Sequence, residues 1–202
     1  MTATVAEAER IADALPTYKG TSQMTLQYRF WPATLRAKPL IDAGRLGQVT
    51  HFRGAYLHAG SVDRDKPLNW KADATQGGGA PGVVEASKIA TGSEDELRFE
   101  IHGDNGAIRF NLMDPNWLDF CDQPDADSPL GGERGWKRIA AVSRYDKPAG
   151  FPSPKNAIDW MRGHMHCLYN FLDAIAKGEP GQPNLATGVE LQRLLGKIAD
   201  MV

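Results

Sequence analysis

Two runs of alternating apolar and polar residues in the middle of the chain constrain its fold more than any other feature. Leu97–His102 and Ala107–Leu112 alternate with a period of two, and Gly103-Asp104-Asn105-Gly106 lies between them. Successive side chains of a strand point to opposite faces of a sheet, and a short connection rich in Gly and Asn is typical of a hairpin. We therefore predict an antiparallel hairpin across these four residues.

Further strands and helices are predicted on both sides of this hairpin. Strand-like patterns occupy the ranges 24–30, 49–58, 82–90, 117–121 and 137–142. Helical spacing of apolar residues predicts helices over 4–15 and 33–43, the second with a kink or a late start at Pro39 and with Gly44 as its C-terminal cap. Two apolar stripes predict two helices near the C-terminal end: Met161, Met165, Leu168, Leu172 and Ile175, then Leu191, Leu194, Leu195, Ile198 and Met201. Central strands with terminal helices predict an α+β fold, a mainly antiparallel sheet with helices packed on one face.

Composition excludes several classes of function. The chain has 202 residues, 42% of them hydrophobic, and a formal net charge of -2, which gives no basic field to attract nucleic acid. No apolar run approaches the roughly 20 residues that a membrane helix needs. We therefore expect a cytoplasmic protein that binds neither nucleic acid nor membrane. Cys121 and Cys167 are expected to be reduced, because they lack the spacing of a metal or redox motif.

Two further motifs suggest ligand sites that their context does not support. Gly77, Gly79 and Gly82 match G-x-G-x-x-G, but polar residues precede them where a dinucleotide site needs a hydrophobic strand, so a turn is favoured. His164 and His166 are two residues apart, which turns them through roughly 200° on a helix and prevents them from sharing one metal. Residue chemistry alone thus leads to a soluble α+β domain without a metal site.

Longer segments resemble a known family. Leu26–Ala33 and Leu40–Gly47 resemble the Gfo/Idh/MocA oxidoreductases, named for glucose-fructose oxidoreductase and inositol dehydrogenase. The resemblance continues through the ranges 51–54, 67–71, 77–80, 85–92, 99–103, 106–110 and 171–183. It implies a relation to NAD(P)-dependent sugar or polyol dehydrogenases, in which a Rossmann domain binds NAD(P) and a C-terminal domain holds the substrate and builds the dimer.

The resemblance covers only the C-terminal domain of that family. Residues 1–20 resemble the last helix of a missing Rossmann domain, and 21–202 resemble the substrate-binding and oligomerisation domain, with a helix and strands missing near 80–82. The chain then begins after the glycine fingerprint and the Glu-Lys-Pro motif of the family, and the missing helix carries the His that relays the proton. We expect a truncated relative with no catalytic or cofactor-binding residues of its own, which binds no cofactor and is inactive alone.

The resemblance also implies a substrate wall and partners. The wall residues are polar or aromatic groups for which a purely structural role is the alternative: Tyr28, Arg29, Trp70, Lys71 and His164. The expected partners are a small sugar or polyol, a second copy bound through the sheet, and a Rossmann-domain partner or a full-length relative. Self-association is expected because the alternating segments 24–30 and 97–112 offer an apolar face that helices only partly cover. The alternatives are a non-catalytic binding or oligomerisation module, or a gene remnant.

Overall fold

The computed structural model describes residues 2–57, 82–141, 148 and 158–200 of the chain. These residues form two units, which are described separately. The sheet unit contains the described residues 31–57, 82–141, 148 and 158–159, and the helical unit contains 2–30 and 160–200.

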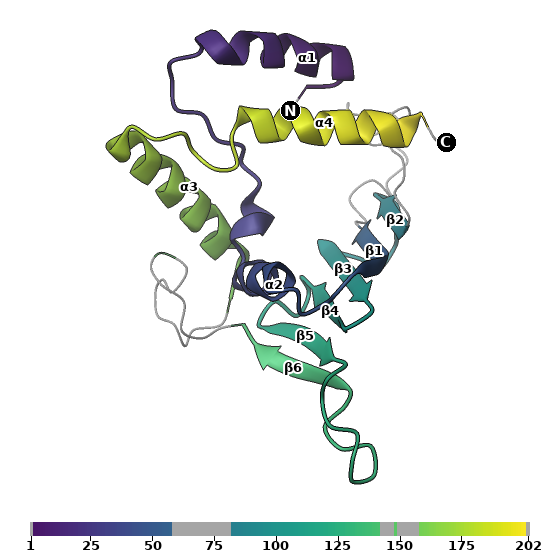
Figure 1. The fold of residues 1–202 in the computed structure, drawn as a ribbon. Helices are drawn as coiled ribbons and strands as arrows, with labels where there is room; N and C mark the ends of the chain where they lie inside the picture. The colour runs from purple at the N-terminus through teal and green to yellow at the C-terminus, as the bar shows by residue number, and fades with distance from the viewer. Residues whose placement is uncertain (1, 58–81, 142–147, 149–157, 201–202) are drawn as a thin grey trace. The chain divides into compact units, whose positions relative to one another are not determined.

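The sheet unit is built on six strands in the order β2-β1-β3-β4-β5-β6 (Figure 1). The strands are β1 (Val49–Leu57), β2 (Gly82–Ser87), β3 (Glu96–Gly103), β4 (Gly106–Asn111), β5 (Trp117–Asp122) and β6 (Trp136–Ala140). Neighbouring strands are antiparallel except for the parallel pair β1 and β2. The predicted hairpin is the pair β3 and β4, in which Phe99 lies opposite Phe110. The predicted α+β fold with a mainly antiparallel sheet is therefore confirmed.

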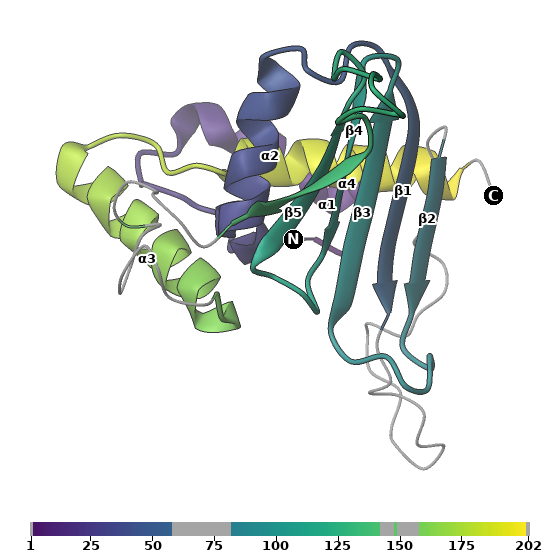
Figure 2. The same ribbon diagram turned by 90° about the horizontal axis from the view of Figure 1, so that it is seen from below.

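Helix α2 (Pro32–Asp42) lies against β5 in the sheet unit (Figure 2). It begins at Pro32, where proline is favoured because the N–H groups of the first turn have no partner within the helix. The late start that Pro39 suggested does not occur, since the helix runs through this proline. Gly44 adopts φ +68° directly after the C-cap residue Ala43, as the sequence predicted for the helix terminus.

The apolar face of the sheet holds the core of the sheet unit. Ile108 and Leu118 are fully buried, and Phe110 and Phe120 are almost so. On the same face Arg45, three residues beyond α2, places its guanidinium 5.3 Å from the centroid of the Phe120 ring and pairs with the buried Asp122. The other sheet face carries charged side chains together with Trp117 and Trp136.

The helical unit consists of α1 (Val5–Ala14), η1 (Leu15–Thr17), η2 (Gln27–Phe30), α3 (Trp160–Lys177) and α4 (Leu185–Ala199). Helix α1 begins with a capping box, in which Thr4 and Glu7 each accept a hydrogen bond from the backbone of the other residue. It lies along α4 (Figure 1), where Arg193 donates hydrogen bonds of 2.7 and 2.6 Å to the carboxylate of Glu9.

The strand predicted over 24–30 is wrong, because this segment bonds locally. Leu26 donates its backbone N–H to Met24, and Arg29 donates to Leu26, which produces the 3-10 turn η2. Met24 itself donates to the carbonyl of Pro183 at 2.6 Å. The alternating pattern of this segment therefore belongs to a short 3-10 turn, which pairs with no strand among the described residues.

Other sequence predictions are confirmed with shifted ends or lie outside the described residues. Strand β2 ends at Ser87, three residues before the predicted Ala90. Cys121 and Cys167 are both free thiols, as expected. Gly77, Gly79 and His58 lie outside the described residues.

Candidate functional site

A row of charged side chains crosses the sheet on the face opposite the apolar core. The strand register places Arg53 opposite Glu100, Glu100 opposite Arg109, Arg109 opposite Asp119, and Asp119 opposite Arg138. Residues directly opposite one another in neighbouring strands share a face. These five residues, here called the charged row, therefore alternate in sign across strands β1, β3, β4, β5 and β6.

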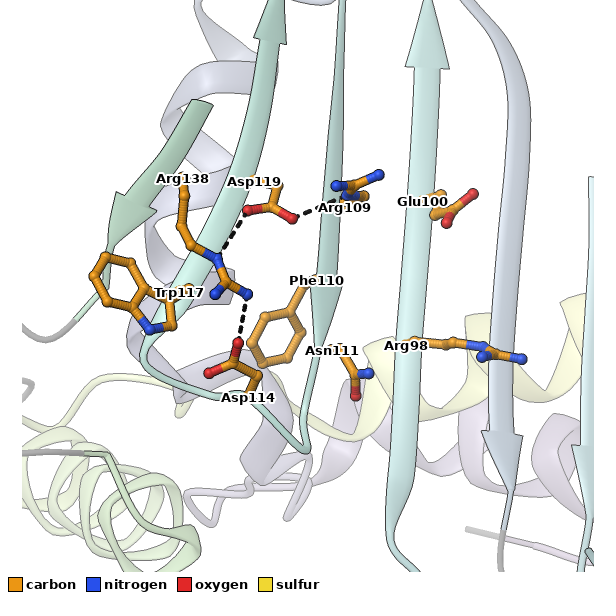
Figure 3. Close-up of a pocket in the computed structure, with 9 residues that line it drawn as sticks. All are labelled: Arg98, Glu100, Arg109, Phe110, Asn111, Asp114, Trp117, Asp119 and Arg138. Carbon is orange, nitrogen blue, oxygen red and sulfur yellow. Dashed lines mark hydrogen bonds and ion pairs between the residues drawn. The ribbon is translucent and has the colours of Figure 1, made fainter. Parts of the chain in front are cut away.

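Asp119 connects two arginines of the charged row. The Nε atom of Arg109 donates to Asp119 at 2.9 Å, and the Nε atom of Arg138 lies 3.5 Å from the other carboxylate oxygen (Figure 3). Arg138 also bonds Asp114 at 2.5 Å. The side chains of Arg109 and Arg138 are 43% and 56% exposed, so each pair contributes only about 0–1 kcal/mol to stability. Both guanidinium groups remain accessible from solvent.

Two tryptophans orient these arginines. The guanidinium carbon of Arg109 lies 4.2 Å from the centroid of the Trp136 ring, and that of Arg138 lies 5.4 Å from Trp117. A planar guanidinium stacks favourably on an aromatic face, which limits the orientations it samples. The arrangement presents fixed hydrogen-bond donors beside aromatic surface.

A hollow of about 330 Å³ lies over this part of the sheet (Figure 3). Its lining residues are Arg98, Glu100, Arg109, Phe110, Asn111, Asp114, Trp117, Asp119 and Arg138. The three arginines balance the three carboxylates, so the hollow carries no net charge. Closely spaced donors and acceptors beside a tryptophan fit a neutral, hydroxyl-rich molecule or a polar protein surface better than a phosphate group.

The described residues contain no cluster of three or more His, Cys, Asp or Glu side chains that could hold a metal ion. Among the helices in the described part of the chain, none combines the length and apolar character required to span a bilayer.

A second group of polar and aromatic side chains lies where η2 packs against α3 in the helical unit. The rings of Phe30 and His166 have centroids 4.9 Å apart. Burial lowers the pKa of His166 below its usual value, and a hydrogen bond with the backbone of Phe30 acts in the opposite direction. His164 is exposed and lies edge-on to Trp160, with 5.0 Å between ring centroids.

Side-chain amides attach the segment before η2 to α3. The Nε2 atom of Gln23 donates to the carbonyl of Cys167 at 2.6 Å, and its Oε1 atom accepts from Asn170 at 2.7 Å. Asn170 also donates to the carbonyl of Gln182 at 2.8 Å. This network joins three separate segments of the helical unit.

Comparison with known proteins identifies relatives of this fold, although no family model matches the chain. The levoglucosan dehydrogenase of Pseudarthrobacter phenanthrenivorans is 24% identical over 262 aligned positions, which cover 92% of this chain. The structure of an oxidoreductase domain protein from Kribbella flavida is 26% identical, with a TM-score of 0.84 over 99% of this chain and 70% of that one. The resemblance to the Gfo/Idh/MocA oxidoreductases is confirmed.

Two solved structures of Gfo/Idh/MocA type contain ligands. Levoglucosan dehydrogenase in complex with NADH and levoglucosan has a TM-score of 0.82 at 23% identity, over 98% of this chain and 68% of that one. An inositol dehydrogenase homologue from Azotobacter vinelandii, complexed with NADH and myo-inositol, has a TM-score of 0.73 at 16% identity, over 98% and 66%. At these identities the likeness shows a common fold.

The match to the curated Gfo/Idh/MocA relative is partial. This chain spans 65% of the length of that relative. The alignment is 262 positions long and the chain has only 202 residues, so the relative carries residues inside the matched region that this chain lacks. An internal deletion relative to this homologue is thus a feature of the sequence.

The structure brings three of the five predicted substrate-wall residues onto two packed elements. Tyr28 and Arg29 lie on η2, which is a 3-10 turn and not the predicted strand, and His164 lies on α3, against which η2 packs. Trp70 and Lys71 lie outside the described residues. The role of all five in binding a substrate remains a prediction.

The sequence interpretation did not single out the charged row. The signal was present, because Glu96, Arg98 and Glu100 alternate with apolar residues along β3. What the sequence alone lacked was the register, which places Arg109, Asp119 and Arg138 beside Glu100 in successive strands.

Proposed function

We propose that this chain supplies the substrate-side and oligomerisation part of an NAD(P)-dependent sugar or polyol dehydrogenase. The observation that carries the proposal is a likeness over 98% of the chain to a levoglucosan dehydrogenase complexed with NADH and levoglucosan. The inositol dehydrogenase homologue with NADH and myo-inositol supports the same class of substrate. Levoglucosan and myo-inositol are both neutral, cyclic and rich in hydroxyl groups.

The only described glycine of the G-x-G-x-x-G pattern, Gly82, does not support a dinucleotide site in this chain. Phosphate groups of NAD(P) bind where a glycine-rich turn is followed by the N-terminus of a helix. Gly82, which closes the G-x-G-x-x-G pattern, instead opens strand β2. We therefore assign NAD(P) to a Rossmann-domain partner or a full-length relative and derive no step through it in this chain.

The substrate wall is proposed at Tyr28, Arg29 and His164. A phenol, a guanidinium and an imidazole together supply donors and acceptors suited to sugar hydroxyls. Trp160, edge-on to His164, adds exposed aromatic surface to the same stretch of α3. A single neutral ring would satisfy such a surface without burying a charge.

Self-association through the sheet is part of the proposal, but its physical basis differs from the sequence expectation. Ile108, Phe110, Leu118 and Phe120 on the apolar face are buried, and the accessible face carries the charged row. A second copy displaced by one strand would place positive side chains opposite negative ones. Such a contact weakens as salt screens the charges.

Sugar binding to the chain tests the proposal. Ligand-observed NMR with levoglucosan, myo-inositol and a panel of neutral sugars should give saturation transfer to at least one of them. The signal should be lost in Arg29→Ala and His164→Ala, whereas Lys38→Ala on the exposed part of α2 should retain it. Absence of transfer from every member of the panel would favour a non-catalytic module or a remnant.

A further inference from the structure

The helical unit contains an open groove along one face of α1. The groove has a volume of about 620 Å³, within the range of roughly 300–1,000 Å³ that is typical of small-molecule sites. Residues three and four positions apart share a face of a helix, which places Ile11, Ala14 and Leu15 side by side. The apolar lining of the groove consists of Ile11, Ala14, Leu15, Tyr18 and Leu185.

A smaller cavity of about 150 Å³ adjoins this groove. Ile11 and Leu185 line both spaces, so the two spaces are separated only by these side chains. Apart from Thr2, the remaining lining of the cavity is apolar or glycine: Ala8, Met24, Gly188 and Val189. An apolar cavity of about this size stays dry and binds apolar ligands. An occupant of the groove that shifts Ile11 and Leu185 could therefore extend its apolar end into the cavity.

The charged side chains of the groove favour one negative charge on the occupant. Arg10 and Lys19 are exposed cations, and Glu7 is the only carboxylate of the lining. The Glu7 carboxylate already accepts hydrogen bonds from the backbone N–H groups of Ala3 and Thr4. No residue of the described chain forms a salt bridge with Arg10 or Lys19. The rim of the groove thus carries a net positive charge.

The walls of the groove are fixed relative to each other. Arg193 of α4 binds the Glu9 carboxylate of α1 with two hydrogen bonds. Gly196 of α4 lies so close to Val5 that a Cβ atom there would overlap its methyl group. A preformed groove costs a ligand little ordering of the protein.

We propose that the groove and the adjoining cavity bind a fatty acid, with its carboxylate at the rim formed by Arg10 and Lys19. A sugar or a phosphate has no apolar body to cover the lining. An acyl chain covers it, and its flexibility allows it to extend past Ile11 and Leu185. This site goes beyond the proposed function and contains none of the substrate-wall residues.

Isothermal titration calorimetry with hexanoate, octanoate and decanoate tests the acyl chain. Affinity should rise with chain length by up to about fourfold per methylene, the factor for complete burial of the group. Gly188→Ala adds a methyl group to the cavity, where its Cβ atom would lie 2.9 Å from the Met24 sulfur. This variant should weaken decanoate more than hexanoate. Equal affinities for hexanoate and decanoate, or 1-naphthoate binding as tightly as decanoate, would overturn the proposal.

A charge reversal tests the rim. Arg10→Glu with Lys19→Glu should weaken decanoate at least about tenfold, because two attractions become two repulsions. The uncharged 1-decanol should bind this variant and the parent within about twofold of each other, since it lacks the carboxylate. Lys197→Glu, the same change at an exposed lysine of α4, is the matched control and should leave decanoate binding intact.

Circular dichroism of each variant establishes that its helices are folded. A parent chain that binds no decanoate would overturn the site and leave the groove to a protein partner. Decanoate binding that survives the double charge reversal, or that falls equally in Lys197→Glu, would contradict the assignment of the carboxylate to Arg10 and Lys19.

Discussion

The position of His166 beside Phe30 couples protonation to stability. Burial lowers its pKa in the folded chain, so the unfolded chain binds a proton at a higher pH than the folded one. Between the unfolded pKa of about 6.5 and the lower folded value, the unfolded state holds more protons. The free energy of unfolding should therefore decrease as the pH falls below about 6.5. Below the pKa of His166 in the folded chain, His166 should cause no further decrease.

His166→Gln should reduce this pH dependence. The free energy of unfolding, measured with urea at pH 7.5 and at pH 5.5, should differ less between the two pH values in the variant than in the parent. His164→Gln is the matched control, because His164 lies two residues earlier on the same helix and is exposed. Identical pH profiles in the parent and His166→Gln would contradict the role of burial at this site.

The two histidines show how far sequence reasoning extends at the residue scale. Their spacing predicted different faces of a helix, and the structure confirms that one is exposed and the other lies against Phe30. The sequence could not tell which one is covered, because the covering residue belongs to η2, a distant segment. A helical period gives the angle between side chains and not the identity of their neighbours.

At the scale of elements, the β3–β4 hairpin depends on close backbone contacts at its turn. A Cβ atom on Gly103 would lie 2.0 Å from the carbonyl oxygen of Leu46, and this backbone atom has little freedom to move. Gly103→Ala should therefore lower the free energy of unfolding by an amount near the upper end of the range of about 1–3 kcal/mol that is typical of overpacking. Urea denaturation measures this loss.

Gly54→Ala is the control for this substitution. Gly54 lies in the neighbouring strand β1, and its added Cβ atom would meet only the side chain of Phe52, at 3.2 Å. A rotation of that ring can accommodate a methyl group, so the loss should be distinctly smaller. Equal losses in the two variants would mean that glycine in the strands matters through backbone entropy and not through the contact with Leu46.

Element predictions were correct where the structure depends on neighbouring residues in the sequence and wrong where it depends on distant ones. The hairpin was predictable because its strands and turn are contiguous in the sequence. The segment 24–30 showed the same alternation but forms a turn, since no neighbouring strand in the described chain pairs with it. The stripe on α3 correctly predicted a helix, but an amphipathic pattern does not reveal whether another element covers it.

At the scale of the whole molecule, the grouping of strands between helices was enough to predict the fold class. The charged row on the sheet could not be predicted from the sequence. The charged row needs four strand pairings to bring Arg53, Glu100, Arg109, Asp119 and Arg138 together. No spacing rule links residues in five different strands. The substrate wall came from a family resemblance, and two of its five residues, Trp70 and Lys71, lie outside the described part of the chain.

We expect this chain to show no dehydrogenase turnover with any sugar, polyol or inositol, even when a separate Rossmann domain is supplied. Oxidation of a carbinol transfers a hydride to nicotinamide, and the hydroxyl proton must leave as the carbonyl forms. A positioned acid or base contributes about 10² to 10⁴ in rate to such a transfer. The family resemblance assigns the proton relay to a His on the helix that is missing near 80–82, and a separate Rossmann domain would not restore this helix.

The decisive assay mixes the chain with a complementary Rossmann domain and follows the absorbance of reduced nicotinamide over a panel of sugars. The control omits this chain, so that any slow oxidation by the Rossmann domain alone is subtracted. Of the histidines on α3, His164 is open to water, which weakens its electrostatic contacts, and His166 is directed to Phe30. Neither is placed as a preorganised base. Turnover that disappears in His164→Ala or His166→Ala would show that a histidine of α3 has taken over the proton transfer, and the chain would then be a catalytic half and not only a substrate wall.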